Sequence, residues 1–268
     1  MKPNTNLRFD IGAHVLEIHE VEFSSRCNLA CRYCPHPKMA RPKADMTEAT
    51  FERVLVHLRH LCDAGTQGEV SLTGIGEAIL HEHFVPWMHR VRQVIGADRK
   101  LVVATNGILV TPALVAEFKR ANATVFVSTH RPEKAGPAVE LLRNAGVTFG
   151  TNTAFVDSAM DWAGQVPWYV SAETKLCAYL QKRWVAVRQD GAVNTCCMDA
   201  ESLHPTSHVD QPVGTLVTFP TKLCEGCHQA VPLDFRINNS WPEEVLAHKR
   251  QQEAQVTNEV KPAHQEAV

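Results

Sequence analysis

Residues 20–35 read EVEFSSRCNLACRYCP and carry Cys27, Cys31 and Cys34, which are separated by three and then two residues. The segment that leads into them alternates and is rich in Val, Ile and Phe, which predicts a β-strand over residues 14–24. Three thiolates in so short a loop suit a metal cluster better than a set of disulfides. A closed tetrahedral zinc site or four-iron cluster needs four thiolates, so three leave one metal position open to a ligand that is not protein.

The composition of the chain limits its class. With 268 residues, 44% of them hydrophobic, it can bury the core of one large domain, with or without a small appendage. The formal net charge of −2 gives no global electrostatic reason to expect nucleic acid or a membrane surface as a partner. No signal-peptide core is visible in residues 1–12, and no segment approaches the roughly 18 apolar residues of a membrane span. We therefore expect a cytoplasmic protein without a membrane partner, in which nine cysteines indicate metal or redox chemistry.

Strand and helix patterns alternate along the first two thirds of the chain. The strands are expected at residues 14–24, 69–80, 101–107, 123–130, 146–153 and 166–170. The helices are expected at residues 46–64, from the end of the second strand to about 95, at 112–120 and at 133–144. Thr47 suits the N-cap of the first helix, Pro112 the first turn of the third, and Gly146 the end of the fourth.

Repeated strand–helix units predict an α/β fold with a parallel sheet, either doubly wound or rolled into a full or partial barrel. In both arrangements, ligands gather beyond the C-terminal ends of the strands. Cys27, Gly76, Asn106 and Ser128 all lie at such ends. We therefore expect these four residues to converge on one mouth.

The helical periodicity is lost in a second region, which contains short strand-like pieces at residues 184–188 and 192–197, joined by Gln189-Asp190-Gly191, a hairpin signal. Its cysteines are Cys177, Cys196, Cys197, Cys224 and Cys227. Because so short a region buries little core of its own, a metal is a sensible folding nucleus for it. A last helix is expected from Trp241 to about residue 255, followed by a disordered tail. The expected units are an extension (1–13), the main domain (14–172), the second cysteine region (173–235) and the helix with its tail (236–268).

The pattern C-x3-C-x-aromatic-C, formed by Cys27, Cys31, Tyr33 and Cys34, resembles the signature of the radical S-adenosylmethionine (radical SAM) superfamily. GIGEA, residues 74–78, is similar to the glycine–glutamate motif of that family, although Ile75 and Ala78 depart from its usual glycine and proline. The resemblance implies a partial (β/α)6 TIM-like barrel. It also implies that the three thiolates hold a 4Fe-4S cluster whose fourth iron binds the amino and carboxylate groups of S-adenosylmethionine (SAM).

The resemblance assigns roles to residues around this cluster. Gly76 would let the backbone approach the methionyl group, Glu77 would accept a hydrogen bond from its ammonium, and Tyr33 would lie against the adenine. Asn106 and Ser128 occupy strand ends where the family presents polar groups to the cofactor. One electron, supplied by a donor such as flavodoxin or ferredoxin, would cleave SAM to methionine and a 5′-deoxyadenosyl radical, which abstracts hydrogen from a substrate in the barrel mouth.

The second cysteine group resembles the auxiliary-cluster region of the twitch and SPASM enzymes of this family. Cys177, Cys196, Cys224 and Cys227 would hold one auxiliary 4Fe-4S cluster with complete protein ligation, and zinc is the alternative. Cys196 is preferred to Cys197 because of its spacing from Gly191 and because consecutive side chains in an extended segment point to opposite faces. Such a cluster would accept or relay an electron, or it would be structural.

These features predict a radical SAM oxidoreductase that dehydrogenates or decarboxylates a small polar molecule. In size and cluster layout the chain is similar to the 2-deoxy-scyllo-inosamine dehydrogenases of that family. The same chemistry applied to a peptide or protein, or to a nucleoside or nucleic-acid base, is an alternative. A non-catalytic iron–sulfur or zinc-binding protein is the alternative from another class.

Four histidines in the first third of the chain are candidate metal ligands by residue type. His57 and His60 are three residues apart in the predicted first helix, and we expect both on its solvated side. His81 and His83 follow the glycine–glutamate motif, where we expect capping or packing rather than ligation.

Overall fold

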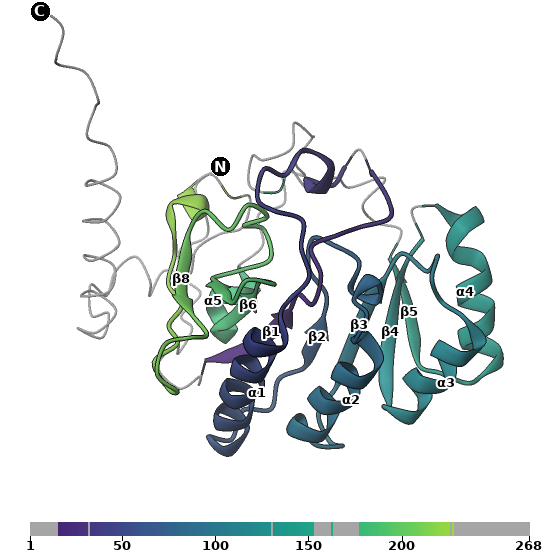
Figure 1. The fold of residues 1–268 in the computed structure, drawn as a ribbon, viewed down its shortest axis with the longest axis horizontal. Helices are drawn as coiled ribbons and strands as arrows, with labels where there is room; N and C mark the ends of the chain where they lie inside the picture. Colours follow the sequence, from purple (N-terminus) through teal and green to yellow (C-terminus); the bar gives the residue numbers. More distant parts are fainter. Residues whose placement is uncertain are drawn as a thin grey trace, which may run out of the picture.

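The computed structural model describes residues 16–31, 33–129, 131–152, 162, 177–225 and 227. Figure 1 shows its fold and labels most of the helices and strands. The strands are β1 Glu17–Val21, β2 Val70–Leu72, β3 Leu101–Thr105, β4 Ala123–Ser128, β5 Phe149–Asn152, β6 Trp184–Val187, β7 Ala192–Asn194 and β8 Pro205–His208. The α-helices are α1 Glu48–Asp63, α2 Phe84–Ile95, α3 Pro112–Arg120, α4 Pro132–Asn144 and α5 Ala178–Lys182. Short 3-10 helices are η2 His36–Lys38, η3 Ala78–Leu80 and η4 Lys222–Glu225.

All eight strands form one sheet in the order β5-β4-β3-β2-β1-β6-β7-β8. Strands β1 to β5 are parallel, and helices follow them so that α1 to α4 cover the outer side of the curved sheet (Figure 1). The chain after β1 loops over the ends of the strands on the far side from their N-termini (Figure 1). The fold is therefore the α/β partial-barrel type that the strand–helix repeats and the family resemblance predicted.

Local signals place the helices where the sequence predicted them. The Thr47 side chain caps α1 by accepting a hydrogen bond from the Thr50 backbone at 3.2 Å. Helix α3 begins at Pro112 and α4 ends at Asn144, two residues before Gly146, which has a φ of 65°. These predicted boundaries are confirmed.

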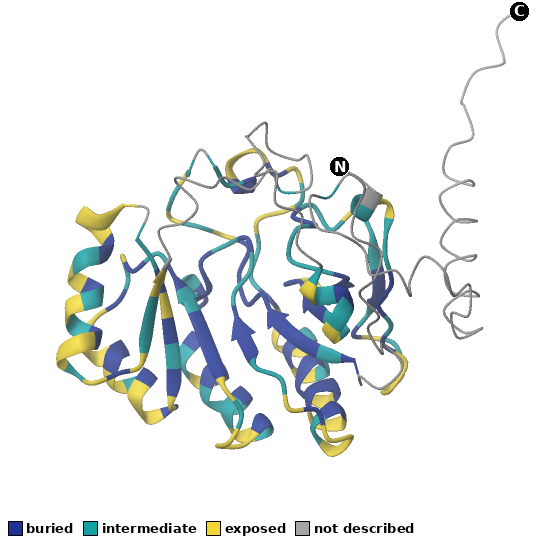
Figure 2. Cartoon of the chain, turned by 180° about the vertical axis from the view of Figure 1, so that it is seen from behind, coloured by how far each residue is buried: buried dark blue, intermediate teal, exposed yellow. Residues whose placement is uncertain are grey.

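An aromatic cluster under β1 decides where the cysteine loop leaves the sheet. Phe23 is fully buried and meets Phe51 of α1 and Trp87 of α2 edge-on, with ring centroids 5.6 and 5.4 Å away. Phe51 and Trp87 stack on each other at 4.0 Å. Figure 2 shows that each of the helices has a buried side and an exposed side, and that the buried side faces the buried strands. This packing fixes β1 against both helices and so fixes the start of the loop that follows it.

The second cysteine region extends the sheet of the main domain instead of forming a separate one. Strand β6 pairs parallel with β1, and β7 and β8 follow antiparallel. Gly191 has a φ of 91° in the predicted hairpin turn, and the Asp190 side chain accepts a hydrogen bond from the Ala192 backbone at 3.1 Å. Val185 and Val193 belong to the hydrophobic cluster that also contains the strands and helices of the barrel. The described part of this region therefore shares the core of the barrel.

Packing of the second region also corrects one expectation. His57 was expected on the solvated side of α1, but it is 1% exposed and its Nε2 donates a hydrogen bond to the Val209 carbonyl at 2.9 Å. The expectation was wrong because the chain after β8 covers this side of α1, which the helical period alone does not reveal. His60 is exposed as expected, and His81 packs in the core with its Nε2 on the Met46 carbonyl at 3.0 Å.

Several expectations fall on residues outside those that the structure describes. They concern the extension at 1–13, the strand at 166–170, and the helix from Trp241 with the tail after it. Within the described residues, no helix is long and apolar enough to cross a membrane.

Candidate metal and cofactor site

The three cysteines of the first loop lie together beyond the end of β1. All three thiols are free and half-buried, and the Cys34 backbone donates a hydrogen bond to the Cys31 carbonyl at 3.1 Å. Burial, followed by the neighbouring thiols Cys31 and Cys27, raises the pKa of Cys34 to about 11, and burial also raises the pKa of Cys27. A metal that binds here must displace thiol protons, so that its binding is coupled to pH. Among the described residues, no three His, Cys, Asp or Glu side chains converge tightly enough to hold a single metal ion.

The glycine–glutamate loop is pressed against the base of the cysteine loop. The Glu77 backbone donates a hydrogen bond to the Arg26 carbonyl at 2.7 Å. A Cβ added to Gly76 would collide with the backbone oxygens of Ser24 and Arg26. Gly76 is therefore required by the contact between two loops of this chain, a closer constraint than the cofactor approach that the resemblance implies.

Glu77 presents a buried oxygen without a partner beside this contact. Its side chain is 3% exposed, and its Oε2 accepts a hydrogen bond from the Asn106 backbone at 2.8 Å. Within the part of the chain that the structure describes, its Oε1 has no hydrogen-bond partner. Burial raises the pKa of Glu77, and the interactions with the Asn106 backbone, the Thr105 side chain and the Ile79 backbone oppose this. An unsatisfied buried acceptor at this position suits an external donor such as an ammonium group.

Asn106 connects the end of β3 to the cysteine loop. Its Nδ2 donates a hydrogen bond to Asn28 Oδ1 at 2.7 Å, and a hydrogen bond to Asn106 lowers the pKa of Cys27 against the larger effect of burial. Ser128 lies one position beyond the Thr105–Val127 pair of β3 and β4, and thus at the same edge. The structure therefore brings Cys27, Gly76 and Asn106 together and places Ser128 on the adjacent strand end.

Tyr33 contacts the first cysteine group directly. Burial and a hydrogen bond with Cys31 raise the pKa of its hydroxyl. Its backbone carbonyl accepts a hydrogen bond from Trp162 Nε1 at 3.1 Å. The expected contact of Tyr33 with an adenine ring stays a prediction.

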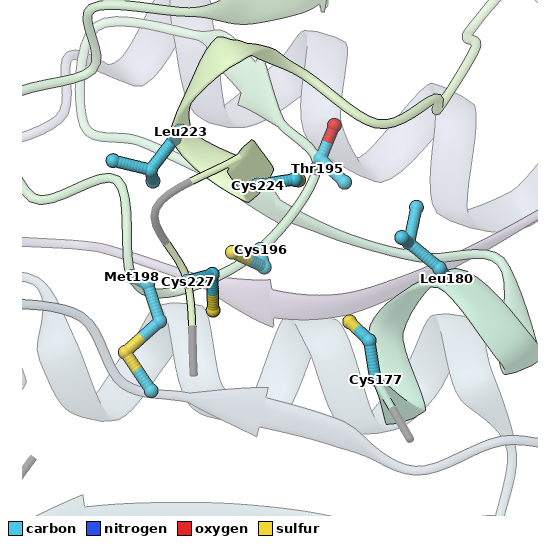
Figure 3. Close-up of a pocket in the computed structure, with 8 residues that line it drawn as sticks. All are labelled: Cys177, Leu180, Thr195, Cys196, Met198, Leu223, Cys224 and Cys227. Atoms are coloured by element: carbon cyan, nitrogen blue, oxygen red, sulfur yellow. The ribbon is translucent and has the colours of Figure 1, made fainter. Parts of the chain in front are cut away.

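The second cysteine group lines one pocket, with about 320 Å³ of empty volume that includes open solvent (Figure 3). Its lining residues are Cys177, Leu180, Thr195, Cys196, Met198, Leu223, Cys224 and Cys227. Figure 3 shows the four cysteine side chains, contributed by three separate segments, around this pocket. Burial raises the pKa of the Cys196 thiol well above its ordinary value, and Cys197 adds to this effect.

Cys197 does not line this pocket and belongs to a different environment. Burial and then the Glu20 carboxylate raise its pKa to about 12, and a hydrogen bond with Tyr179 opposes this. Tyr179 in turn donates a hydrogen bond to Glu20 Oε1 at 2.5 Å. Cys196 and Cys197 thus face different surroundings, as expected for consecutive residues, although the choice of Cys196 as a ligand stays a prediction.

Two residues that no sequence motif indicates lie between the cysteine groups. Glu22 and Arg41 form a salt bridge of 2.9 Å with side chains that are 1% and 7% exposed. The available signal was the sequence EVE at Glu20 to Glu22, which places two carboxylates at the end of a predicted strand. A carboxylate in such a strand needs a buried partner.

The part of the chain that carries the cysteine loop matches a family model. The family model described as "Radical SAM superfamily" matches residues 21–133, which contain the three loop cysteines and the glycine–glutamate motif. The recognition that the loop motif suggested is therefore confirmed for this part of the chain.

Curated relatives of this chain include two GTP 3′,8-cyclases. The protein from Heliobacterium modesticaldum is 33% identical over 135 residues, which are 46% of this chain and 38% of that protein. The protein from Aquifex aeolicus is 28% identical over 139 residues, 50% of this chain and 42% of that protein. The matches thus span less than half of the length of these relatives.

Solved structures share the fold over almost the whole chain. BtrN in complex with AdoMet and 2-DOIA has a TM-score of 0.63 at 15% identity, and the match covers 91% of this chain and 90% of that chain. Native anSMEcpe with bound AdoMet and the Cp18Cys peptide has a TM-score of 0.57 at 14% identity, over 91% and 99% of the two chains. At such identities the likeness shows the fold.

The residues present fit the cofactors that the family implies, a 4Fe-4S cluster and SAM. The first loop offers three free thiols, the ligand type of iron–sulfur clusters, and leaves a fourth position to be filled. The unpartnered oxygen of Glu77 lies on the neighbouring loop, where the resemblance places the SAM ammonium. The four cysteines of the pocket supply the number and type of donors that a second cluster needs, although in the described structure they do not converge on a single metal ion such as zinc.

Proposed function

We propose that this protein is a radical SAM oxidoreductase that cleaves SAM reductively and removes a hydrogen atom from a small polar substrate. In this proposal Cys27, Cys31 and Cys34 hold the first 4Fe-4S cluster. The second cysteine pocket holds an auxiliary 4Fe-4S cluster that accepts or relays an electron, for dehydrogenation or decarboxylation. A small electron carrier such as flavodoxin or ferredoxin would supply the reducing electron, and a cytoplasmic location fits this need.

One observation carries the proposal: a three-thiol loop lies directly against a buried carboxylate with an unused oxygen. The Asn106 backbone donates to Oε2 of Glu77, and among the described residues no donor reaches its Oε1. The Arg26 carbonyl anchors the Glu77 backbone, which fixes the carboxylate relative to the cysteines. An amino-acid group could bind the open metal position while its amino group donates a hydrogen bond to the anchored Glu77 carboxylate.

The residues of the chain position the reactants, and the reaction itself depends on the cofactors. When bound, the cluster would supply the electron that cleaves SAM to a 5′-deoxyadenosyl radical. Glu77 would orient the methionyl ammonium, and Asn106 would keep the Glu77 carboxylate and the cysteine loop in register. The substrate would occupy the same end of the sheet, near Ser128.

A nucleotide or nucleoside substrate is the second candidate. The observation that favours it is that the curated relatives, at 33% and 28% identity over 135 and 139 residues, are GTP 3′,8-cyclases. These matches cover less than half of each relative, so we retain the small polar molecule as the first candidate. A peptide substrate has weaker support, from the fold shared with the peptide complex of anSMEcpe.

The test begins with anaerobic reconstitution and metal analysis. We expect about eight irons per chain if both sites hold 4Fe-4S clusters, and about four with one zinc if the second site binds zinc. With SAM and a strong reductant, 5′-deoxyadenosine should form. Iron-loaded protein that never forms it would support a non-catalytic iron–sulfur protein instead.

Substrate identity calls for a separate experiment. Fractionated cell extract should contain a component that stimulates 5′-deoxyadenosine formation and changes mass in the same reaction. A loss of two hydrogens would indicate dehydrogenation, and a loss of carbon dioxide would indicate decarboxylation. Stimulation by GTP alone would favour the nucleotide candidate.

A further inference from the structure

The Glu22 carboxylate receives hydrogen bonds from three segments that meet only in the folded chain. Arg41, on the return arm of the cysteine loop, donates through Nη2 to both carboxylate oxygens at 2.9 Å. The Ile75 backbone, in the glycine–glutamate loop, donates to Oε1 at 2.8 Å. The Gln189 backbone, in the hairpin of the second cysteine region, donates to Oε2 at 3.4 Å. One carboxylate therefore links both cysteine regions and the proposed SAM-binding loop.

Arg41 also contacts the second region directly. Its Nε donates to the Ala200 carbonyl at 2.5 Å, and its Nη1 donates to the Gln189 side chain. The Glu201 carboxylate accepts hydrogen bonds from the backbones of Ala40 and Arg41 at 2.8 and 2.9 Å. The return arm of the cysteine loop is thus held by the segment that follows Cys196 and Cys197.

A second buried arginine extends the same network to the turn that carries Cys196. Arg188 is fully buried, and its Nη2 donates to the carbonyls of Cys197 and Asp199 at 3.0 and 2.9 Å and, more weakly, to that of Cys196 at 3.3 Å. Glu22 makes the largest favourable electrostatic contribution to the raised pKa of Arg188, which burial opposes. Buried charges are tolerated only while their partners stay in place. The turn after β7 and the loops of the first site therefore depend on each other.

We propose that Glu22 and Arg41 are positioning residues that couple the two cysteine sites. Filling the second site fixes the turn after β7, which holds Arg41 through Ala200 and Glu201 and thereby holds the glycine–glutamate loop through Glu22. A filled second site raises the affinity of the first site for SAM, and by thermodynamic reciprocity SAM stabilises the second region. This inference rests on the proposed function, because it takes SAM as the ligand of the first site.

A double-mutant cycle on cluster-loaded protein tests the coupling. Removal of the second site by the double variant Cys224→Ala/Cys227→Ala should raise the dissociation constant of SAM about tenfold, within the range typical of coupled sites. Glu22→Gln, which leaves Arg41 without its anionic partner, should raise it by a similar factor. When all three substitutions are combined, the dissociation constant of SAM should still rise no more than about tenfold, because the second-site variant and Glu22→Gln break the same link. Factors that multiply to about a hundredfold, or a second-site variant that binds SAM normally, would overturn the proposal.

Hydrogen–deuterium exchange on the metal-free protein gives a readout that depends on neither cluster. Glu201→Gln weakens the clamp at a half-buried carboxylate and is less disruptive to folding than Glu22→Gln. Although Glu201 belongs to the second region, we expect Glu201→Gln to speed hydrogen exchange both at residues 40–41, which it contacts, and at residues 74–78, which it does not. Glu82→Gln, at a side chain that is 82% exposed, is the matched control. Faster exchange limited to the neighbours of residue 201 would contradict the coupling.

The two experiments separate the inference from the proposed function. A native protein that loads only four irons with no zinc would remove the auxiliary site from the proposed function, yet the exchange experiment would still decide whether Glu22 and Arg41 link the loops. Suppose instead that the native protein loads eight irons and binds SAM, but that the effects of the variants on the dissociation constant of SAM multiply when they are combined. The proposed function would then stand and the coupling would be rejected.

Discussion

The two cysteine sites differ in the way that their donors are assembled. The first takes three thiols from one loop at the end of β1 and lies beside Glu77, whose Oε1 is buried without a partner. The second takes four thiols from three separate segments and lines the rest of its pocket mainly with Leu180, Met198 and Leu223 (Figure 3). The first site is incomplete in donors and rich in polar neighbours, whereas the second is complete in donors and mostly apolar.

This difference separates a site that binds an external ligand from one that does not. An unused buried acceptor carries a desolvation cost that a ligand can relieve, so its presence favours ligand binding. A full set of thiolates leaves no metal position open, and an apolar lining offers a substrate no polar contact. The two sites would therefore divide the chemistry into SAM binding at the first and electron transfer at the second.

The largest effect should come from deleting one thiol at each site. Cys34→Ala should reduce 5′-deoxyadenosine formation to background, because the remaining two thiols cannot hold the cluster that supplies the electron. Cys227→Ala should retain SAM cleavage at saturating SAM but lose conversion of substrate. Chromatographic quantification of 5′-deoxyadenosine against product measures both. Equal loss of 5′-deoxyadenosine in the two variants would remove the proposed division of labour.

A second pair of variants tests which neighbouring cysteine completes the second site. Cys196→Ala should reduce the iron content from about eight to about four, because Cys196 lines the pocket. Cys197→Ala should leave it near eight, since its thiol lies toward Tyr179 and Glu20. Iron analysis with Mössbauer spectroscopy measures both. The reverse result would assign the ligand to Cys197.

The unused oxygen of Glu77 gives the next largest effect. In Glu77→Gln the side-chain oxygen would still accept from the Asn106 backbone, but an NH2 group would face the incoming ammonium. We expect the dissociation constant of SAM to rise roughly 10- to 100-fold, the equivalent of one hydrogen bond to a charged group. Titration calorimetry measures it, and Glu140→Gln, an exposed position on α4, is the control. An unchanged constant would show that the Glu77 carboxylate does not contact SAM.

Residues with local signals were predicted well from sequence. The periodicity and caps of α1, α3 and α4 give their bounds, because helix ends are determined within one turn by residues such as Thr47 and Pro112. The spacing of the first cysteines likewise lies within one loop. Residues 184–194 formed the predicted hairpin because Asp190 and Gly191 determine its turn locally.

Features that depend on distant segments were missed for the same reason. The pairing of β6 with β1 joins residues more than a hundred positions apart, and nothing in either strand specifies the partner. The Glu22–Arg41 salt bridge becomes visible only when the second region closes over the loop. His57 was misplaced because the segment that buries it, around Val209, lies outside its own helix.

The smallest expected effect is a pH-dependent loss of stability at His57, which should differ between the second region and the barrel. Burial lowers the pKa of His57 below its ordinary value of 6.5, the charges of Arg53 and His60 lower it further, and the backbone carbonyls of Val209 and Gln211 oppose this. As the pH falls below 6.5, the unfolded chain binds a proton that the native chain resists, so stability is full above 6.5 and is lost toward lower pH.

The loss should fall on the second region, because the His57 hydrogen bond joins Val209 to α1. From about pH 7.5 to about pH 5.5 we expect a loss of stability of at most about 1.4 kcal/mol, the limit set by one pH unit below the unfolded pKa, measured by hydrogen–deuterium exchange of metal-free protein with rates corrected for intrinsic pH dependence. The protection of residues 205–211 should fall more than that of residues 70–78. His57→Gln, which keeps a donor for the Val209 carbonyl, should remove most of this difference. Equal loss in both segments would mean that the second region does not open separately from the barrel, and the shared core around Val185 and Val193 would then unite the two cysteine sites in one cooperative unit.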